Sequence, residues 1–503
     1  MSGVELGLAV LATADICLRY GKSLVDKYRT FKGAKSEIDD KIISLEIFEK
    51  KTECQIKFLK SIWSTLPSEY QEIVGITYPT LQKKLQIADQ AVGRIISKHP
   101  PEKASSLAWS KRFLYTVYFK EVLEKTISDV NEWQRIFDPT WFLVVRVPGQ
   151  VVDTGLRHYA GTSTTLSLSY RLRNSLTNEE ASEEKGIYLP YVNFPSSQRS
   201  AIKFSDASLV TRPGKASIII DSVEFQESNT SGLPKDIRYL AQKLRNIDPL
   251  IFQILKCEGV MKVKDVSKQI IHFDFVLRVP RDMGKPQSLR ELLVTTSCQT
   301  YPLSDRIRIA NHLASSISFV HTYKIVHKDV RPETILVLSD RESKLGSLFL
   351  TGFKTFRMVD EQSMRAGDND WARNIYRHPE RQGLHPEEDY RMLHDIYSLG
   401  VCLLEIGLWE SLVQYKPTAR LEMQPNNLLQ MDGVITPNLS SKALFMRLAE
   451  KELPGKMGNL YAQVVLTCLD YCDEEENHGA ITEGVRYIER PLLRSITLPT
   501  LHR

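Results

Sequence analysis

The chain has 503 residues, 42% apolar and 25% charged, and its 66 basic and 61 acidic residues leave a net charge of +5. This composition is typical of a globular protein with several packed cores, and it excludes an intrinsically disordered chain. The small net charge excludes a dedicated nucleic-acid coat, so no nucleic-acid partner is expected. Seven scattered cysteines without zinc-binding spacing indicate reduced, buried thiols in the cytoplasm and no metal site.

Residues 1–140 have helical periodicity, because apolar residues recur every three or four positions. Two of the repeating series are Ile43, Ile47, Cys54, Phe58, Ile62 and Leu81, Leu85, Ala88, Val92. We expect several helices, separated at Pro67, Pro79, Pro100 and Pro101, that form an all-α antiparallel four-helix bundle. No stretch reaches the ~20 apolar residues of a constitutive membrane span, and the N-terminus does not have the pattern of a secretory signal. Residues 141–185 are interpreted as a connector or brace with a short helix of its own.

The period changes near Gly186. Short β-branched runs, residues 217–220 and 273–279, predict strands, and residues 234–246 predict a helix between them. From Leu289 onward the pattern is mostly helical. The sequence therefore predicts a bilobal α+β domain over residues 186–503, with an N-lobe at about 186–285 and a C-lobe at about 286–503.

One motif identifies this second domain. The stretch from His327 to Leu336 reads HKDVRPETIL and resembles the protein-kinase catalytic loop H-R-D-L-x-x-x-N. Three landmarks follow in the expected order: Leu350-Thr351-Gly352-Phe353-Lys354 at the D-F-G position, His378-Pro379-Glu380 at the A-P-E position, and Asp395-Ile396-Tyr397-Ser398-Leu399-Gly400 at the start of a buried helix. The resemblance implies a protein-kinase fold.

The sequence departs from the kinase pattern at the residues that serve catalysis. It contains no G-x-G-x-x-G loop, Asp221 stands at the strand-lysine position, and residues 234–246 contain no glutamate. Gly352 replaces the D-F-G aspartate and Thr334 replaces the catalytic-loop asparagine, so both metal ligands of the family are changed. We therefore expect a pseudokinase that is not an enzyme and has no cofactor, with weak ATP binding left open. The vestigial site comprises His327, Asp329, Arg331, Thr334, Gly352, Phe353 and Asp221.

The N-terminal segment resembles the HeLo-like helical domains of fungal cell-death proteins. The matching stretches are GVELGLAV at residues 3–10, DICLRYGK at 15–22, ISLE at 43–46, FLK at 58–60 with Trp63, and FDPTW at 137–141. A helical bundle before a kinase-like domain also resembles the mixed-lineage-kinase-domain-like effectors of programmed cell death. This resemblance implies a bundle that oligomerises and permeabilises the membrane once the kinase-like domain releases it.

The first 35 residues have the composition that such a role needs. An apolar helix followed by basic residues would suit an anionic membrane surface. At rest the same helix is expected to lie in the core of the bundle. The predicted membrane-interacting residues are Val4, Leu6, Leu8, Val10, Leu11, Arg19, Lys22 and Lys27.

The resulting hypothesis is a membrane-acting cell-death or defence effector, cytoplasmic at rest and at the plasma membrane when active. Its expected partners are further copies of itself, anionic lipids and an unknown upstream activator. Phosphorylation of Thr355, Ser363 or Tyr376, near Arg365 and Arg373, is a possible signal. Two alternatives stay open: a divergent active kinase that transfers phosphate from ATP to serine or threonine, and a cytosolic scaffold that makes no lipid contact.

Overall fold

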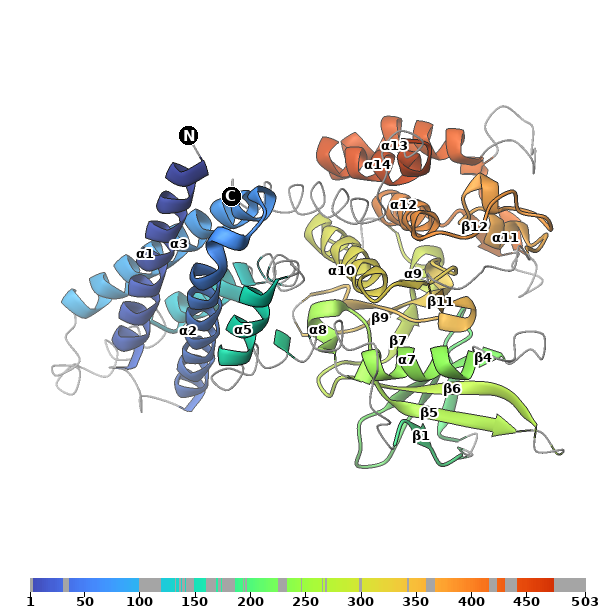
Figure 1. The fold of residues 1–503 in the computed structure, drawn as a ribbon, viewed down its shortest axis with the longest axis horizontal. Coiled ribbons are helices and arrows are strands. Elements are labelled where there is room, and N and C mark those ends of the chain that lie inside the picture. The colour runs from blue at the N-terminus through green and yellow to red at the C-terminus, as the bar shows by residue number, and fades with distance from the viewer. Residues whose placement is uncertain are drawn as a thin grey trace. The chain divides into compact units, whose positions relative to one another are not determined.

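The computed structural model describes most of the chain as two compact units, Met1–Glu179 and Glu180–Arg503. Figure 1 shows the helices of the first in blue to teal and the mixed elements of the second in green to red. The continuous described ranges are 3–29, 36–98, 119–131, 149–159, 186–192, 197–224, 233–245, 247–264, 269–297, 301–341, 343–358, 367–415, 423–429 and 441–474; isolated described positions are 133, 134, 137, 141, 169, 170, 173, 194 and 266.

Nearly all described residues of the first unit are helical, which confirms the predicted helical N-terminal region. Its elements are α1 (Gly3–Arg29), α2 (Ser36–Ile62), η1 (Trp63–Thr65), α3 (Ser68–Lys98) and α5 (Gln150–Tyr159), with a further helical stretch over residues 119–131. Helix α5 falls in the segment predicted to be a connector with a short helix. The antiparallel four-helix arrangement stays a prediction.

Two glycines let α1 approach its neighbours closely. A Cβ at Gly7 would lie 2.8 Å from the Trp63 indole nitrogen, and one at Gly75 would lie 3.2 Å from Val10. A side chain at either position would force its neighbour to shift, so the two glycines favour this close packing of α1. Val10, Ala14 and Cys17 are buried on this face, so the expectation that the apolar side of the first helix forms core holds where its side chains are described.

Pro79 was expected to separate two helices, and this expectation is wrong. It lies inside α3, which continues from Ser68 to Lys98. Proline removes one intrahelical donor and normally breaks a helix, but tertiary contacts support this stretch. The carbonyl of Thr77 accepts a hydrogen bond from the Trp133 indole at 2.9 Å, and that of Tyr78 accepts one from the Cys17 thiol at 3.5 Å. Packing has overridden local propensity here.

The second unit contains a six-stranded mixed sheet in the order β1-β5-β6-β4-β3-β2. We call this sheet, with its helices, the sheet lobe. Its elements are β1 (Tyr188–Leu189), β2 (Arg199–Ala201), β3 (Ser208–Val210), β4 (Ile218–Glu224), α7 (Leu233–Arg245), α8 (Pro249–Phe252), β5 (Lys256–Lys264) and β6 (Ile270–Arg278). Strands β4 and β6 and helix α7 confirm the predictions for those segments.

The register of the sheet sets the direction of its side chains. Strand β4 pairs antiparallel with β6, with Asp221 opposite Phe275. Because side chains alternate along a strand, Ile218 and Ile220 share one face, where they join a buried cluster with Val210, Met261 and Val276. Helix α7 packs against β5 (Figure 1).

The remainder of the second unit is mostly helical, and we call it the helical lobe. Its helices are α9 (Leu289–Thr295), α10 (Leu303–Thr322), η5 (Pro332–Thr334), η6 (Phe353–Thr355), α11 (Trp371–Asn374), η7 (Pro379–Arg381), α12 (Met392–Leu408), η8 (Asn427–Leu429), α13 (Ser441–Met457) and α14 (Asn459–Glu474). Its strands are β7 (Pro286–Ser288), β8 (Ile325–Val326), β9 (Ile335–Leu338), β10 (Ser347–Leu350), β11 (Arg357–Met358), β12 (Val413–Tyr415) and β13 (Met423–Pro425).

Helix α12 anchors the helical lobe. All of its residues are buried, so it has no polar face and needs neighbours on every side. Gly400 and Gly407 make this packing possible: a Cβ at Gly400 would lie 2.9 Å from Cys468 of α14, and one at Gly407 would lie 2.6 Å from Leu453 of α13. The first residues of α12 reach the segment that carries the candidate site.

Candidate functional site

One buried carboxylate holds the loop from His327 to Thr334 in place. Asp395, in the first turn of α12, accepts hydrogen bonds from the backbone amides of His327 at 2.8 Å and Lys328 at 2.9 Å. It also contacts the Tyr390 hydroxyl and the His321 ring, both at 3.1 Å. Burial alone raises its pKa, but these bonds and the neighbouring histidines outweigh burial and hold the pKa below its ordinary value.

His327 links this loop to the segment that follows β10. Its Nδ1 accepts a hydrogen bond from the Asp329 amide, which leaves Nε2 to donate to the Thr351 carbonyl at 3.0 Å. Its ring also lies 4.8 Å from the Phe353 ring. Burial lowers the pKa of His327, and the ring is neutral in this position. His327 and Phe353 thus lie together, as the kinase resemblance implies.

Asp329 is a buried anion between two arginines. Arg331 Nε donates to one carboxylate oxygen at 2.8 Å, and Arg373 of α11 approaches the other at 3.4 Å. Burial would raise the pKa of Asp329, but the two guanidinium groups more than offset this and hold the pKa below its usual value. Asp329 is therefore ionised at neutral pH and able to accept a proton or a hydrogen bond. Arg373 was not among the predicted site residues.

The two positions that bind metal in kinases do not offer the same ligands here. Thr334 uses its hydroxyl within the loop, where it donates toward the carbonyls of Asp329 and Arg331 at 2.7 and 2.9 Å. Gly352 has φ of +82°, and a Cβ there would lie 2.6 Å from the Thr334 Cβ. A larger side chain at 352 would therefore be both strained and blocked. These two residues do not fit the metal position of the family, and we assign them no metal.

A carboxylate nevertheless lies beside Gly352, and it comes from the sheet lobe. Asp221 of β4 accepts hydrogen bonds from the amides of Gly352 at 2.7 Å and Phe353 at 3.3 Å. Burial raises its pKa to about 6, while those amides and nearby Lys354 oppose the rise. In kinases a strand lysine pairs with the phosphates and with a helix glutamate. Here the strand carries the acidic Asp221, and the nearby positive charge comes from Lys354.

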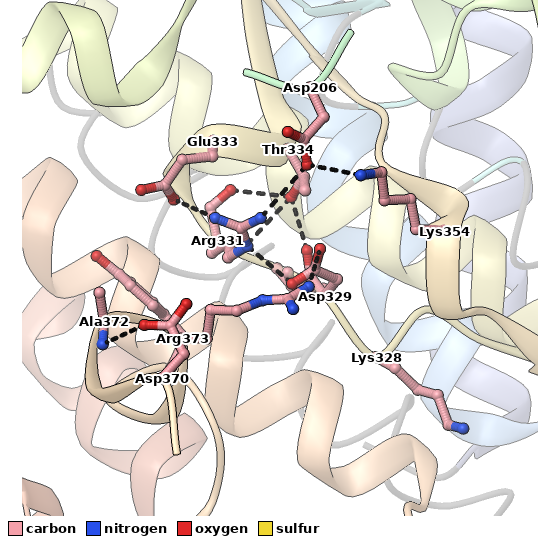
Figure 2. A network of polar contacts seen from close by, with 12 residues as sticks. Asp206, Lys328, Asp329, Arg331, Glu333, Thr334, Lys354, Asp370, Ala372 and Arg373 are labelled. Carbon is pink, nitrogen blue, oxygen red and sulfur yellow. Dashed lines mark hydrogen bonds and ion pairs between the residues drawn. The ribbon is translucent and has the colours of Figure 1, made fainter. Parts of the chain in front are cut away.

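Lys354 also binds an acidic residue on the loop between β2 and β3. Figure 2 shows Asp206 above the catalytic loop, facing Lys354 on one side and Arg331 on the other. The Asp206 carboxylate lies 3.0 Å from Lys354 Nζ and 4.0 Å from Arg331 Nη2. Arg331 also pairs with Glu333 at 3.2 Å. Sequence reasoning missed Asp206 and did not assign a role to Lys354.

A buried ionic network lies on the other side of Glu333. Arg290 is fully buried and contacts Glu333 at 2.9 Å, Glu405 at 3.0 Å and the Tyr376 hydroxyl. Tyr376 also donates to Glu405 at 2.9 Å. Tyr376 was predicted as a possible phosphoacceptor, and this stays a prediction; its hydroxyl is enclosed between Arg290 and Glu405, so it would have to leave these partners to be phosphorylated. Thr355 is exposed, and Ser363 lies outside the described residues.

The predicted membrane-interacting residues lie in different environments in the structure. The side chains of Val4, Leu6 and Leu8 lie outside the described part of the structure. Val10 is buried, Leu11 is half-buried, and Arg19 and Lys22 are exposed on α1. Lys27 instead binds Asp89 of α3 at 2.7 Å, so in this conformation it forms an ion pair between α1 and α3. Among the described helices, none is long and apolar enough to cross a bilayer.

One group of described side chains has the spacing of metal ligands. Potential ligand atoms of His378, Glu380 and His394 all lie within 4.8 Å of one another. However, His394 Nδ1 accepts a hydrogen bond from the Arg391 amide at 2.8 Å, which places the ring proton on Nε2, facing Glu380 at 3.8 Å. A metal-binding histidine usually donates through its second nitrogen. The hydrogen bonding therefore favours a histidine–carboxylate contact, and we assign no metal here.

The loop fixed by Asp395, the His327–Phe353 contact and the mixed sheet beside a helical lobe define a protein kinase-like domain. A model of the family described as protein tyrosine and serine/threonine kinase matches residues 255–428. A serine/threonine-protein kinase-like protein of Arabidopsis thaliana is 33% identical over 124 residues, which cover 24% of this chain and 33% of that protein. The mitogen-activated protein kinase kinase mkk2 of Aspergillus fumigatus is 28% identical over 122 residues, covering 24% of this chain and 21% of that protein.

These comparisons correct one prediction. The chain was expected not to be an enzyme, but the matched family is one of kinases and the relatives are named as kinases or kinase-like. The finding points to a kinase. The chain spans no more than about a third of the length of the relatives it matches. The resemblance of the N-terminal region to HeLo-like domains stays a prediction, because the family match begins at residue 255.

Proposed function

We propose that the kinase-like domain transfers the γ-phosphoryl group of ATP to a protein hydroxyl and releases ADP, with Asp329 as the group that accepts the hydroxyl proton. The observation that carries this proposal is the state of Asp329: a buried, ionised carboxylate on a loop whose backbone is tied to Asp395. Phosphoryl transfer depends chiefly on positioning and charge stabilisation. The fixed loop supplies the positioning, and Arg331 keeps the carboxylate ionised.

Residues of this chain account for three requirements of such a reaction. Asp329 orients and deprotonates the acceptor hydroxyl, Arg331 and Lys354 provide positive charge beside it, and Asp221 orders the Gly352–Phe353 turn through two amide contacts. Arg373 contacts the outer oxygen of Asp329 at 3.4 Å. An acceptor hydroxyl would replace that contact, so Arg373 has to move when substrate binds. No step is assigned to a metal, because Thr334 and Gly352 do not fit one.

The direct test is phosphate incorporation by the full-length chain. Labelled ATP and general protein acceptors should give incorporation that Asp329→Asn reduces by about 10²-fold or more, the usual contribution of a positioned proton acceptor. Asp282→Asn, an exposed aspartate between β6 and β7, is the matched control and should leave incorporation unchanged. Equal incorporation in wild-type protein and Asp329→Asn would refute the role of Asp329.

A second candidate function concerns the helical unit. We propose that it acts on anionic membranes under the control of the kinase-like domain, as a cell-death or defence effector that is cytoplasmic at rest and forms homo-oligomers at the plasma membrane. The supporting observation is α1, which buries an apolar face and exposes Arg19 and Lys22. Basic residues near an anionic surface each contribute about 1 kcal/mol of attraction.

Liposomes provide the test of this second proposal. Full-length protein should bind phosphatidylserine vesicles and release an enclosed dye, while Arg19→Glu with Lys22→Glu should weaken binding by about ten-fold or more because two attractive charges become repulsive. Lys83→Glu, an exposed lysine on α3, controls for net charge. If Lys83→Glu weakens vesicle binding as much as Arg19→Glu alone does, the attraction depends on net charge and not on the position of the charges on α1. Absence of binding under all conditions favours the scaffold alternative.

A further inference from the structure

The loop between β2 and β3 lies against the helical lobe, and we call residues 202–207 the β2–β3 loop. In a kinase the corresponding loop is glycine-rich and covers the phosphates. Here it contains Lys203, Phe204 and Asp206 instead. The Lys203 carbonyl accepts a hydrogen bond from the Ser288 hydroxyl at 2.6 Å, and the Phe204 ring lies 4.3 Å from that of Tyr415. Two contacts thus fix the loop to residues beyond the sheet.

The backbone of the loop is shaped to hold this position. Phe204 has φ of +54°, in the left-handed region that bulky residues rarely adopt. The Ser205 amide donates to the Ile202 carbonyl at 3.1 Å, which closes a tight turn. The turn directs Asp206 toward the catalytic loop. A strained residue that persists at a functional site needs surrounding contacts to hold it, and the Phe204–Tyr415 contact does so.

Asp206 meets two cations of the helical lobe at once. Its carboxylate lies 3.0 Å from Lys354 and 4.0 Å from Arg331 (Figure 2). The Asp206 side chain is 60% exposed, whereas Lys354 is 27% and Arg331 13% exposed. Asp206 is therefore the most exposed and most loosely held of the three charged side chains, while Lys354 and Arg331 are more enclosed. Such an arrangement lets the anion leave while the cations stay.

We propose that Lys354 and Arg331 form a binding position for a phosphate group, and that the Asp206 carboxylate occupies it as an internal competitor until the β2–β3 loop lifts. The ligand class is a polyphosphate such as a nucleoside triphosphate. A phosphate carries more charge and more acceptor oxygens than a carboxylate, so it displaces Asp206 at sufficient concentration. This inference rests on the proposed kinase function for its biological ligand, but the site itself is defined by these three side chains.

Calorimetric titration of the full-length chain tests the competition directly. The probes are ATP and inorganic tripolyphosphate, each without divalent metal and at one fixed low ionic strength, because salt screens exposed charges. Asp206→Asn removes the competing charge and should tighten the binding of both probes by about three- to five-fold, the value of a partly exposed ion pair. Lys354→Gln should weaken both by a similar factor. Asp282→Asn should change neither.

A second variant tests whether the loop itself has to lift. Phe204→Ala removes the contact with Tyr415 without changing any charge, and alanine leaves the strain of the positive φ in place. It should also tighten polyphosphate binding by about three-fold or more, because an aromatic pair of this kind stabilises the closed loop. Hydrogen exchange at residues 202–207 should accelerate in the same variant. Tighter binding in Asp206→Asn with unchanged binding in Phe204→Ala would overturn the requirement for loop movement.

The outcomes separate this inference from the proposed kinase activity. Unchanged or weaker binding of both probes in Asp206→Asn would overturn the competition, whatever phosphate transfer is measured. Tripolyphosphate binding that depends on Asp206 and Lys354 supports the site even in a preparation without phosphate transfer. Binding of ATP alone, insensitive to Lys354→Gln, would place the nucleotide elsewhere and overturn the assignment.

Discussion

Two loops of the second unit face one another but are held in opposite ways. The catalytic loop at His327–Thr334 is tied to Asp395 by two backbone amides and enclosed by His321 and Tyr390, all buried. The β2–β3 loop is held by one hydrogen bond from Ser288, by the Phe204–Tyr415 contact and by an ion pair in which Asp206 is 60% exposed. Buried bonds leave unsatisfied groups when broken, whereas exposed pairs exchange with water at little cost. We therefore expect the loop at His327–Thr334 to be rigid and the β2–β3 loop to be able to move.

The largest effect is expected from removing the hydrogen bonds by which Asp395 holds the His327–Thr334 loop. Asp395→Asn replaces one acceptor oxygen with an NH₂ group that faces existing donors, and should lower the free energy of unfolding by about 3 kcal/mol or more. Chemical unfolding followed by circular dichroism measures this. Hydrogen exchange at residues 325–336 should accelerate in parallel, and Asp282→Asn should leave both unchanged. A loss below 1 kcal/mol would place the support of the loop elsewhere.

The next prediction concerns pH and Asp221. Its pKa is raised by burial to about 6, so the folded protein holds this proton more tightly than the unfolded chain. The resulting stability is present below the unfolded pKa of about 4 and is lost as pH rises through about 6, a change of roughly 3 kcal/mol for two pKa units.

Asp221→Asn isolates this contribution, because the amide oxygen still accepts from Gly352 and carries no charge. The variant should gain stability relative to wild-type protein between pH 4.5 and 7.5, measured as the difference in urea midpoints. An identical pH profile in the two proteins would contradict the raised pKa of Asp221.

A smaller effect is expected where two turns of the helical lobe meet, at Thr334 and Gly352. Gly352→Ala introduces a Cβ that would lie within 2.6 Å of the Thr334 Cβ at a positive φ, and should cost about 2 kcal/mol. Thr334→Gly in the same chain removes the clash but not the strained backbone, so the double variant should recover part of the loss. Purely additive effects in a double-mutant cycle would show that the two positions do not communicate.

The smallest predicted change concerns Arg373, one of the two cations beside Asp329. Arg373→Gln removes one of two cations beside Asp329, so the pKa of that carboxyl rises toward its ordinary value. If Asp329 accepts a proton during phosphate transfer, the acidic limb of the pH–rate profile moves to higher pH. Because Arg373 is 28% exposed, stability should change by less than about 1 kcal/mol. An unmoved acidic limb would assign it to another group.

Local sequence predicted those parts of the site that are contiguous in the chain. The stretch His327–Thr334, Phe353 and the following helices are recognised because neighbouring residues carry the pattern. The contacts of Asp206, Lys354 and Arg373 were not predicted, because each of these residues meets a partner that is distant in the sequence. The burial of Tyr376 could not be predicted for the same reason: it follows Arg373 closely in the chain, but its hydroxyl is turned to Arg290 and Glu405.

The same limitation explains the two broader corrections. Pro79 predicts a break, but the Trp133 and Cys17 donors that support neighbouring carbonyls lie in other helices. The enzyme prediction weighed five positions one at a time and concluded that catalysis was absent. The family match over residues 255–428 weighs the whole pattern, and the structure adds a carboxylate beside Gly352 that comes from a distant strand.

The contact between positions 334 and 352 has a consequence for the history of this domain. Because the space above Gly352 is filled by Thr334, an aspartate acquired at 352 alone would arrive in a site too small to receive it. Kinases carry an asparagine and an aspartate at these two positions, and both are larger than the residues found here. Regaining that pair would therefore require a new backbone path at Gly352, away from its positive φ, and the loss of the hydroxyl contacts that Thr334 makes within its loop.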